Sequence, residues 1–364
     1  MVSRRDFVRL TTCCALAAAA PKLAAAAAAP AQTSRLHIID MANAAYFDRD
    51  QVPDGLDGTN ACRQVNDRFL ANLRDRGVDT IIRYYSDRNN AGLNCKNITV
   101  RERDLLHDFD FAVGIVYQYN GRARDRYTMQ TADHDSRFIL ERAKRIGQPE
   151  GSTIYIGVDS DRSLNTDENI LAYFALLNAR LTPQYRIGVY AAGSRCRLLK
   201  ERGLASFFWI PEAPAWDGTQ AFLNSGDWTF FQNKTEVGQS ALTRDVGQAV
   251  RIDTSIVNPA AGNSIGAFKR DGTIKTYGAA KLETIAAHRK WVNVPRLEIL
   301  DRPQGRPVGH SCVARTIHVL SESDGWAEVD RDEDGLSDGY CRSGDLAPLA
   351  EMPRWKRGCV PARI

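Results

Sequence analysis

The chain has 364 residues, a formal net charge of +4 and 43% hydrophobic residues, with basic and acidic side chains interspersed. So small a charge neither favours nor excludes an anionic polymer, and nothing in its distribution requires nucleic acid as a partner. The six histidines are scattered and no cysteine pair has zinc-finger spacing. Metal catalysis through thiolate or imidazole is therefore disfavoured, and we expect neither a metal nor a cofactor.

Residues 1–31 have the features of an export signal. SRRDF places Arg4 and Arg5 before an Ala-rich apolar run that ends in small residues suited to cleavage. This segment resembles a twin-arginine signal, which predicts a mature periplasmic or secreted protein starting near Ala31. Pro21 and Lys22 interrupt the run and leave it short for a spanning helix, which favours cleavage over a retained anchor. We therefore expect no stable membrane span after cleavage.

Residues 36–260 alternate between extended and helical patterns. Short apolar runs rich in β-branched and aromatic residues predict strands, and apolar residues at helical spacing predict helices between them. The expected strands are residues 36–42, 79–87, 112–120, 152–161, 185–193, 206–213, 228–234 and 250–258. The expected helices are residues 58–77, 97–110, 131–147, 166–181, 194–203 and 218–226. The last crossover, residues 236–248, has the weakest helical pattern.

This alternation predicts an α/β fold with a parallel sheet and helices outside it. Eight strands in this length favour a closed (β/α)8 TIM-like barrel over a doubly wound open sheet. No Gly-rich phosphate loop follows the first strand, so the sequence gives little support to a dinucleotide-binding version of the open sheet.

The pattern changes after residue 260. Residues 261–291 are typical of a linker with one short helix, and residues 351–364 of an irregular basic tail. Between them, residues 292–350 contain short extended pieces separated by Gly, Asp and Ser. These pieces predict a small all-β barrel.

Two features of this β region predict local chemistry. Cys312 and Cys341 lie on either side of its central hairpin, and we expect a disulfide between them because a small core gains from a cross-link. Asp330, Asp332 and Asp334 begin like a calcium-binding loop. Position twelve of that loop is the same Cys341 instead of a bidentate Glu, which favours a solvated acidic hairpin over a calcium site.

Polar residues follow one predicted strand after another. Because side chains alternate along a strand, we expect Asp159 and Asp161 to point the same way at the carboxyl end of the fourth strand, where barrels carry their chemistry. The other strand ends offer, in chain order, Asp40, Arg83, Tyr85, Gln118, Tyr190, Trp209, Glu212, Gln232 and Asp253. We expect Asp253 to lie opposite Asp40 across the closing seam of the barrel.

Crowded carboxylates raise one another's pKa, so that a protonated acid and an ionised partner coexist near neutral pH. Glycoside hydrolysis needs this pair, with aromatic rings to stack on sugars and amides to bind hydroxyl groups. Structural alternatives stay open for the same residues. Arg83 could pair with Asp40 or another acid, and Tyr190 and Trp209 could serve the core.

Several of these motifs together resemble a known family. RYYS, GIVYQYN, GSTIYIGVDSD, YRIGVYAAGSRC and the late Trp, Gln and Asp elements resemble the secreted glycoside-hydrolase-like barrel domain. This family of unknown function is itself similar to the lysozymes of glycoside hydrolase family 25. The resemblance covers roughly residues 36–259. It implies that Asp40, the pair Asp159 and Asp161, and Asp253 correspond to the acids of those lysozymes.

The resemblance also reveals a departure. Asp161 stands where the lysozymes have their catalytic Glu, and Asp is one methylene shorter. Its oxygen would fall short of a leaving group by more than about 1 Å, and a displacement of that size can cost on the order of 10²-fold in rate.

The β region resembles a bacterial SH3-like domain, in which a Gly-Trp pair, here Gly325 and Trp326, follows a hairpin. The resemblance implies binding to cell-wall peptides. The structural alternative is a module that packs on the barrel as an appendage.

The sequence thus predicts an exported cell-envelope protein that acts on a glycan, with peptidoglycan as the preferred candidate. In a catalytic version, Asp161 is the general acid, Asp159 is the base or orients an acetamido group, and Asp40 and Asp253 set the local field. The alternative is a glycan-binding protein with a degenerate glycosidase site. The Asp in place of Glu favours binding alone, whereas the full set of carboxylates favours hydrolysis.

Overall fold

The computed structural model describes residues 38–42, 44–45, 63–86, 96–119, 121, 123–161, 164–237, 250, 252–333 and 335–354. Eight strands close into a barrel in the order β1-β10-β9-β8-β7-β6-β5-β4. They are β1 (Ile38–Asp40), β4 (Thr80–Tyr85), β5 (Ala112–Tyr117), β6 (Thr153–Gly157), β7 (Arg186–Tyr190), β8 (Phe207–Ile210), β9 (Phe230–Val237) and β10 (Ile252–Val257). Two short strands, β2 (Ala44–Ala45) and β3 (Arg63–Gln64), pair separately. The predicted export signal lies outside the described residues.

The closed barrel is confirmed, but one strand runs the other way. Strand β10 is antiparallel to both of its neighbours, β1 and β9, whereas the other neighbouring strands of the barrel pair in parallel. The expectation of eight parallel strands is therefore wrong for the last one. An antiparallel neighbour needs no helical crossover, which fits the weak helical pattern before β10. The reversal brings the amino end of β10 to the carboxyl ends of the other strands, and there Asp253 lies opposite Asp40.

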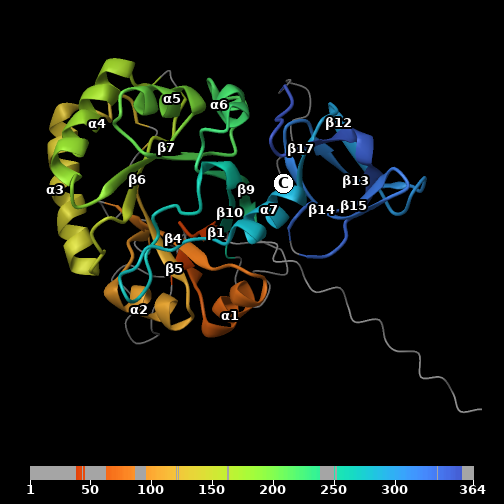
Figure 1. Cartoon of the computed structure of the whole chain (residues 1–364), viewed down its shortest axis with the longest axis horizontal. Helices are drawn as coiled ribbons and strands as arrows, with labels where there is room; N and C mark the ends of the chain where they lie inside the picture. Colours follow the sequence, from red (N-terminus) through yellow and green to blue (C-terminus); the bar gives the residue numbers. More distant parts are fainter. Residues whose placement is uncertain are drawn as a thin grey trace, which may run out of the picture. The chain divides into compact units, whose positions relative to one another are not determined.

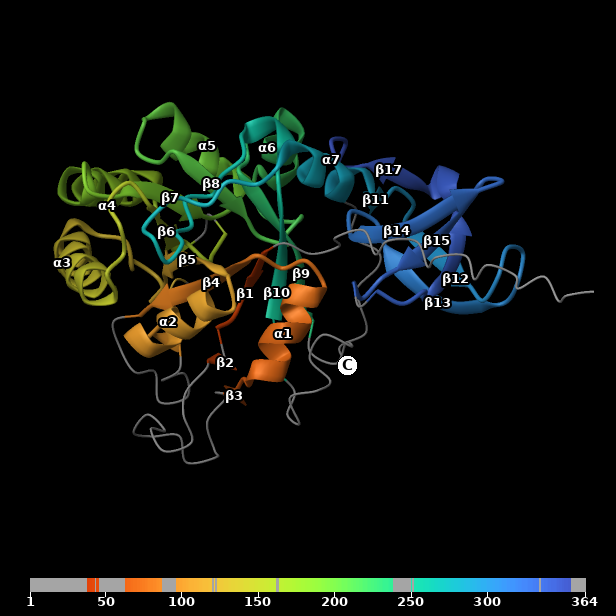
Figure 2. The ribbon, with the colours of Figure 1, turned by 60° about the horizontal axis from the view of Figure 1, so that its bottom comes forward.

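The helices that the structure describes between the barrel strands lie outside the barrel (Figures 1 and 2). They are α1 (Asp67–Asp75), α2 (Val100–Asp108), α3 (Met129–Ile146), α4 (Asp167–Leu181), α5 (Gly193–Glu201) and α6 (Thr219–Ser225). Side-chain hydrogen bonds cap the amino-terminal ends of several of these helices. The Asn66 side chain accepts from the backbone N–H of Phe69 at 2.9 Å, and the Thr128 hydroxyl accepts from that of Thr131 at 3.2 Å.

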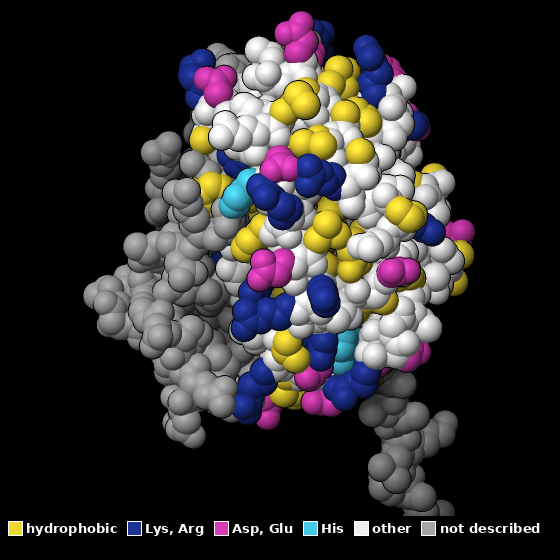
Figure 3. All heavy atoms as spheres, turned by 90° about the vertical axis from the view of Figure 1, so that its left-hand side faces the viewer, with side chains coloured by type: hydrophobic (Ala, Val, Ile, Leu, Met, Phe, Trp, Pro, Cys, Tyr) yellow, Lys and Arg dark blue, Asp and Glu magenta, His cyan; other side chains and the backbone are white. Residues whose placement is uncertain are grey.

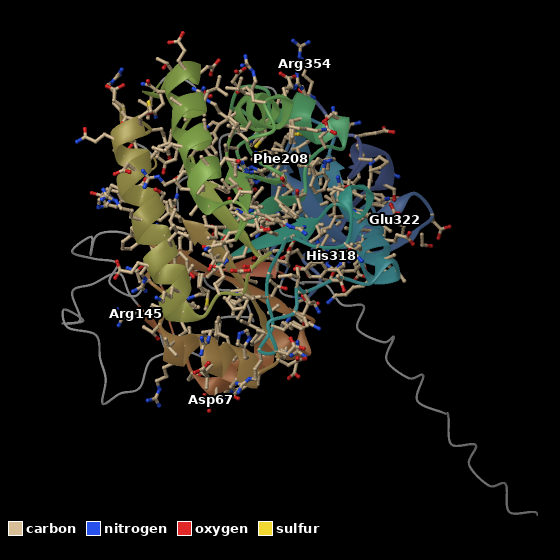
Figure 4. The ribbon with its side chains drawn as sticks, turned by 60° about the vertical axis from the view of Figure 1, so that its left-hand side comes forward. Asp67, Arg145, Phe208, His318, Glu322 and Arg354 are labelled. Carbon is tan, nitrogen blue, oxygen red and sulfur yellow. The ribbon has the colours of Figure 1, made fainter. Side chains whose placement is uncertain are left out.

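Helices α3 and α4 lie side by side on one face, which Figure 3 shows with Lys and Arg, Asp and Glu, and hydrophobic side chains interspersed. Asp133 of α3 pairs there with Arg137 at 2.6 Å and with Arg180 of α4 at 2.5 Å. Figure 4 places Arg145 on the outside of the molecule, whereas Phe208 of β8 lies inside it. None of the helices in the described part of the chain is both long and apolar enough to cross a membrane.

Alternate side chains of the barrel strands enter two different cores. In β4, Ile82 and Tyr84 point to the barrel interior, and Ile81 and Tyr85 point to the layer between strands and helices. Aromatic rings fill the interior, where Trp209 stacks on Phe230 with centroids 4.8 Å apart. The side chain that a strand sends inward at its carboxyl end therefore reaches the mouth of the barrel.

The amino-terminal end of the barrel is closed by part of the predicted linker. The backbone N–H of Thr153 donates to the carbonyl of Gly266 at 3.0 Å, and the hydroxyls of Tyr277 and Thr80 lie 2.9 Å apart. Gly266 has φ +75°, and a Cβ there would lie 1.9 Å from the Thr153 hydroxyl, so this contact requires glycine. This segment follows the short 3-10 helix η5 (Pro259–Ala261) and packs on the barrel. Helix α7 (Ala279–Ala287) comes after it.

The remaining residues form one antiparallel sheet in the order β13-β12-β16-β15-β14-β11-β17. Its strands are β11 (Arg289–Val292), β12 (Arg296–Leu300), β13 (Pro307–Cys312), β14 (Thr316–Ser323), β15 (Trp326–Asp330), β16 (Gly339–Arg342) and β17 (Leu346–Pro348), with the 3-10 helix η6 (Ser343–Asp345) before β17. An all-β unit after the barrel is confirmed, and we call it the β module. The predicted Cys312–Cys341 disulfide is wrong, because Cys341 is a free thiol buried in the apolar core of the module.

The acidic loop after β15 contacts the barrel. Glu333 is 1% exposed and lies 3.0 Å from the guanidinium of Arg289. Its carboxylate also accepts from the side-chain amide of Asn233 at 2.5 Å and from the hydroxyl of Thr254 at 3.2 Å. The sequence predicted a solvated acidic hairpin, and this prediction is wrong for Glu333, which is buried against the barrel. Of the acids proposed for a calcium loop, Asp330 accepts from the backbone N–H of Gly335 at 2.8 Å, and Asp334 lies outside the described residues.

Candidate functional site

A cavity of about 400 Å³ opens at the carboxyl ends of the parallel strands, and we call it the mouth cavity. Among the predicted site residues, its wall contains Gln118, Asp159, Tyr190, Trp209, Glu212, Gln232 and Asp253. The wall also contains Ala42, Tyr84, Val116, Pro211, Ala213, Trp216 and Thr235, which the sequence analysis did not single out. Strand ends that are far apart in the chain thus meet at one place, as a closed barrel requires.

A hydrogen-bonded network at this end connects two acids. Asp40 is 2% exposed, and its carboxylate accepts from the Tyr84 hydroxyl at 2.7 Å and from the Gln232 amide nitrogen at 3.4 Å. The same nitrogen donates to Asp253 at 2.7 Å, while the Gln232 carbonyl oxygen accepts from the Tyr190 hydroxyl at 2.9 Å. Gln232 thereby bridges the two carboxylates that the register of β1 and β10 places opposite each other.

The charge of Asp40 is adjustable. Burial raises its pKa to about 6, and the hydrogen bonds from Tyr84 and Gln232 oppose part of that rise. Both donors are neutral groups, so they stabilise the carboxylate less than a guanidinium would. Asp40 therefore changes protonation close to neutral pH while it remains fixed in place.

Gln118 is held tightly between two neighbours. A Cβ on Gly157 would lie 2.9 Å from Cγ of Gln118, so the glycine in β6 leaves the space that this side chain fills. On its other side, Nζ of Lys96 donates to Oε1 of Gln118 at 2.9 Å. The amide that lines the mouth cavity is thus fixed in orientation.

Lys96 is a residue of this site that the sequence analysis missed. Its Nζ lies 4.6 Å from the centroid of the Tyr84 ring, in the range of a cation–π contact. Burial lowers the pKa of Lys96 to about 8, and the charges of Asp40 and Asp159 oppose that decrease. Lys96 belongs to the connection before α2, where no hydrophobic period marks it as a site residue.

Two predicted site residues of β4 point away from the mouth cavity. Arg83 is fully buried between strands and helices, where its guanidinium pairs with Glu102 of α2 at 2.9 Å and donates to the backbone carbonyl of Met41. The Tyr85 hydroxyl donates to the side chain of Gln148 at 2.9 Å. Arg83 and Tyr85 flank the inward-facing Tyr84, so the two predicted site residues lie one position out of phase with the inward face of the strand. Arg83 therefore has the structural role left open by the sequence, in which it pairs with an acid, and that acid is Glu102.

The structure separates the pair Asp159 and Asp161. Asp159 lines the mouth cavity, whereas the Asp161 carboxylate accepts from the backbone N–H of Asp217 at 3.2 Å. The expectation that both point the same way is wrong, because β6 ends at Gly157 and the chain turns. In that turn the N–H of Ser160 donates to the carbonyl of Val158 at 2.9 Å, so the alternation of a strand no longer holds.

Glu212 connects the mouth cavity to the β module. Its carboxylate accepts from the Thr235 hydroxyl at 3.0 Å and pairs with the guanidinium of Arg315. Next to it, Trp209 lines the wall and contacts the ring of Tyr190 with centroids 4.7 Å apart. A residue of the β module thus neutralises one acid of the cavity wall.

The mouth cavity therefore combines three kinds of group. Asp159 and Asp253 supply carboxylate acceptors, and Gln118 and Gln232 supply amides. Tyr84, Tyr190, Trp209 and Trp216 supply aromatic surface and hydroxyl groups. Aromatic faces beside hydrogen-bonding groups suit a ring that carries several hydroxyl groups.

The residues of the barrel match a known protein family. A family model described as "Rv2525c-like, glycoside hydrolase-like domain" matches residues 71–257. Among curated proteins, the chain is similar to the uncharacterized protein YbfG of Bacillus subtilis (strain 168), with 27% identity over 172 residues. It is also similar to the uncharacterized protein FadG of the same organism, with 25% identity over 178 residues. These matches cover 44% and 47% of this chain but only 24% and 31% of the two relatives.

Among solved structures, the Tat-secreted protein Rv2525c of Mycobacterium tuberculosis, in complex with L-tartrate, has a TM-score of 0.46 and 20% identity, covering 61% of this chain and 95% of that chain. The virulence factor GHIP, a glycosyl hydrolase 25 of Streptococcus pneumoniae, has a TM-score of 0.37 and 14% identity, covering 63% of this chain and 89% of that chain. The family model itself covers 187 of the 364 residues. The chain therefore belongs to the Rv2525c-like, glycoside hydrolase-like domain family.

Proposed function

We propose that the barrel binds a glycan of the cell envelope in its mouth cavity, with peptidoglycan as the preferred ligand. The observation that carries this proposal is the lining of one cavity by carboxylates, amides and aromatic rings that come from separate strands. Sugars are recognised by this combination, because rings stack on their apolar faces while amides and carboxylates bind their hydroxyl groups. Membership of a glycoside hydrolase-like family supports the same ligand class.

The geometry favours binding over hydrolysis. Asp161, the expected general acid, lies outside the lining of the mouth cavity, and Glu212 is neutralised by Arg315. Asp40 is enclosed beneath the wall and holds its hydrogen bonds within the protein. Glycoside hydrolysis needs two carboxyl groups that flank the scissile bond. The two acids of the predicted catalytic set that line the cavity, Asp159 and Asp253, do not include the predicted general acid.

Hydrolysis is the second candidate, and a separate observation favours it. Asp40 has a pKa of about 6 and shares Gln232 with Asp253, so an acid that changes protonation near neutral pH is hydrogen-bonded through one amide to an acid of the cavity lining. In that version Asp159 is the acid that reaches the leaving oxygen, in place of Asp161. The glycan strand of peptidoglycan is the corresponding substrate class.

Two assays on the mature protein separate these candidates. Calorimetric titration with soluble peptidoglycan fragments measures binding, and release of reducing ends from cell-wall preparations measures hydrolysis. We expect Asp159→Asn and Asp253→Asn to weaken binding about tenfold or more, and Asp161→Asn, the matched control, to leave it unchanged. Reducing ends released by the unaltered protein but not by Asp159→Asn would establish hydrolysis instead. Equal affinity in all three variants would overturn the assignment of the cavity.

Export is a further part of the proposal. It rests on the segment SRRDF and the Ala-rich run after it, which lie outside the described residues. Replacing Arg4 and Arg5 with lysine should leave the precursor in the cytoplasm, as fractionation of cells would show. Unchanged export of that double variant would remove the twin-arginine assignment.

The β module has two candidate roles. Its resemblance to SH3-like domains favours attachment to wall peptides, whereas the contacts of Glu333 and Arg315 with the barrel favour a structural role. Arg315→Met tests this directly. If the module supports the cavity, this variant weakens fragment binding, and if the module serves attachment alone, the affinity for soluble fragments does not change.

A further inference from the structure

The segment that carries Lys96 is anchored along the end of β4. Asn97 forms a parallel bridge with Tyr84, and the N–H of Ile98 donates to the Tyr84 carbonyl at 3.1 Å. The Asn97 side chain accepts from the N–H of Ser86 at 2.7 Å and donates to its carbonyl at 2.8 Å. The backbone next to Lys96 is therefore fixed relative to the strand that supplies Tyr84 to the mouth cavity.

The Lys96 ammonium lies among groups of the mouth cavity. It donates to Gln118 at 2.9 Å and faces the ring of Tyr84, whose hydroxyl in turn donates to Asp40. The charges that act on Lys96 are Asp40 of β1, Asp159 after β6 and Arg83 of β4. Arg83 is itself paired with Glu102, so its charge is largely compensated.

We propose that Lys96 is a positioning residue of the glycan site, which fixes the Gln118 amide and supplies a positive charge beside the carboxyl groups of Asp40 and Asp159. The identity of the ligand rests on the proposed function, whereas the action on the two acids does not. Lys96 touches the side chains that line the cavity and acts on the ligand through them.

The two roles of Lys96 predict a pH window for binding. The Asp40 carboxylate is lost as the pH falls through about 6, and the Lys96 charge is lost as the pH rises through about 8. Binding should therefore weaken on both sides of this range. Lys96→Arg keeps the charge at every accessible pH, because a guanidinium does not lose its proton there, so this variant should lose the alkaline limb. Lys96→Met keeps similar bulk and removes the charge.

The experiment measures affinity for a soluble disaccharide-peptide fragment of peptidoglycan from about pH 5 to about pH 9, together with a carbon-NMR titration of the Asp40 carboxyl group. At neutral pH we expect Lys96→Met to bind about tenfold more weakly and Lys96→Arg to stay within about threefold of the unaltered protein. The NMR midpoint of Asp40 should move upward in Lys96→Met, because a neighbouring cation has been removed. Lys144→Met, on the exposed face of α3, is the matched control and should change neither quantity.

The outcomes separate the two proposals. An Asp40 midpoint and a pH profile that stay unchanged in Lys96→Met would overturn the role of Lys96, even if the fragment binds. An upward shift of that midpoint without fragment binding by the unaltered protein would support Lys96 and overturn the glycan assignment. If Lys96→Met does not fold, Lys96→Arg still decides, because retention of the alkaline limb in that variant contradicts the proposal.

Discussion

Buried carboxylates occur in two regions of this molecule with different partners. In the layer between strands and helices, Glu102 pairs with Arg83 at 2.9 Å and Asp135 pairs with Arg126 at 2.6 Å. At the mouth of the barrel, Asp40 is as deeply buried but receives its hydrogen bonds from the neutral side chains of Tyr84 and Gln232. In that layer Glu102 and Asp135 thus each have a guanidinium partner, whereas Asp40 at the mouth accepts its hydrogen bonds from neutral groups.

The difference distinguishes carboxylates with a structural role from a carboxyl group whose protonation can change. In a buried ion pair, the attraction of the guanidinium offsets the desolvation cost of the carboxylate and favours its ionised form. Asp40 instead has a pKa of about 6, which makes its charge sensitive to a ligand or a neighbouring cation. Three experiments test this comparison, in order of decreasing expected effect.

The largest effect is expected for an acid in the layer between strands and helices. Glu102→Gln leaves the fully buried guanidinium of Arg83 without its charge partner, and this should lower the free energy of unfolding by about 3–5 kcal/mol. Urea unfolding followed by circular dichroism measures the change. Asp104→Asn, a half-exposed acid on the same helix that pairs with Arg103, is the control and should cost less than about 1 kcal/mol. Equal losses in the two variants would contradict the contrast drawn between the regions.

The second effect has the opposite sign and depends on pH. Because folding raises the pKa of Asp40 from 3.8 to about 6, the stability from this group is present below about pH 3.8 and is lost as the pH rises through about 6. The shift corresponds to at most roughly 3 kcal/mol. Asp40→Asn should therefore match the unaltered protein at low pH and be equally or more stable above pH 6. Melting curves over this range check the prediction, and a variant that is less stable at high pH would place Asp40 with the structural acids.

The smallest effect is expected for Asp161, which follows β6 and lies outside the lining of the mouth cavity. Its carboxylate accepts a hydrogen bond from the backbone N–H of Asp217 in an exposed setting. Asp161→Asn should change the free energy of unfolding by no more than about 1 kcal/mol. Fragment affinity should not change at all. A clear loss of affinity in this variant would return Asp161 to the site.

The fold was predictable to the extent that it depends on pattern. The alternating strands and helices indicate the barrel directly, because each buried strand is short, apolar and bounded by turn residues. The direction of β10 was not predictable, since a strand has the same side-chain period whether it runs parallel or antiparallel. The closure of the amino-terminal end by residues 263–277 depends on contacts such as that of Gly266 with Thr153, which no local pattern records.

The site shows the same division. Asp159, Gln232 and Asp253 were predicted because they are polar residues at the ends of apolar strands, and the structure places them at the mouth. In β4 all six residues are buried, so hydrophobicity could not show that Tyr84 faces inward while Arg83 faces outward. Lys96 comes from a connection without periodicity. Its place follows only from the pairing of that segment with β4.

The contacts of the β module with the barrel bear on cooperativity. Trp291 of β11 packs against Phe231 of β9 with ring centroids 5.3 Å apart, and Met352 accepts hydrogen bonds from two side chains of α6. With Glu333 inserted beside β9 and β10, these contacts should make barrel and module melt in a single calorimetric transition. A fragment limited to residues 71–257 lacks β1, the closing segment and the module, and should not fold independently. The length of chain that sequence similarity defines is then shorter than the length that forms a thermodynamic unit.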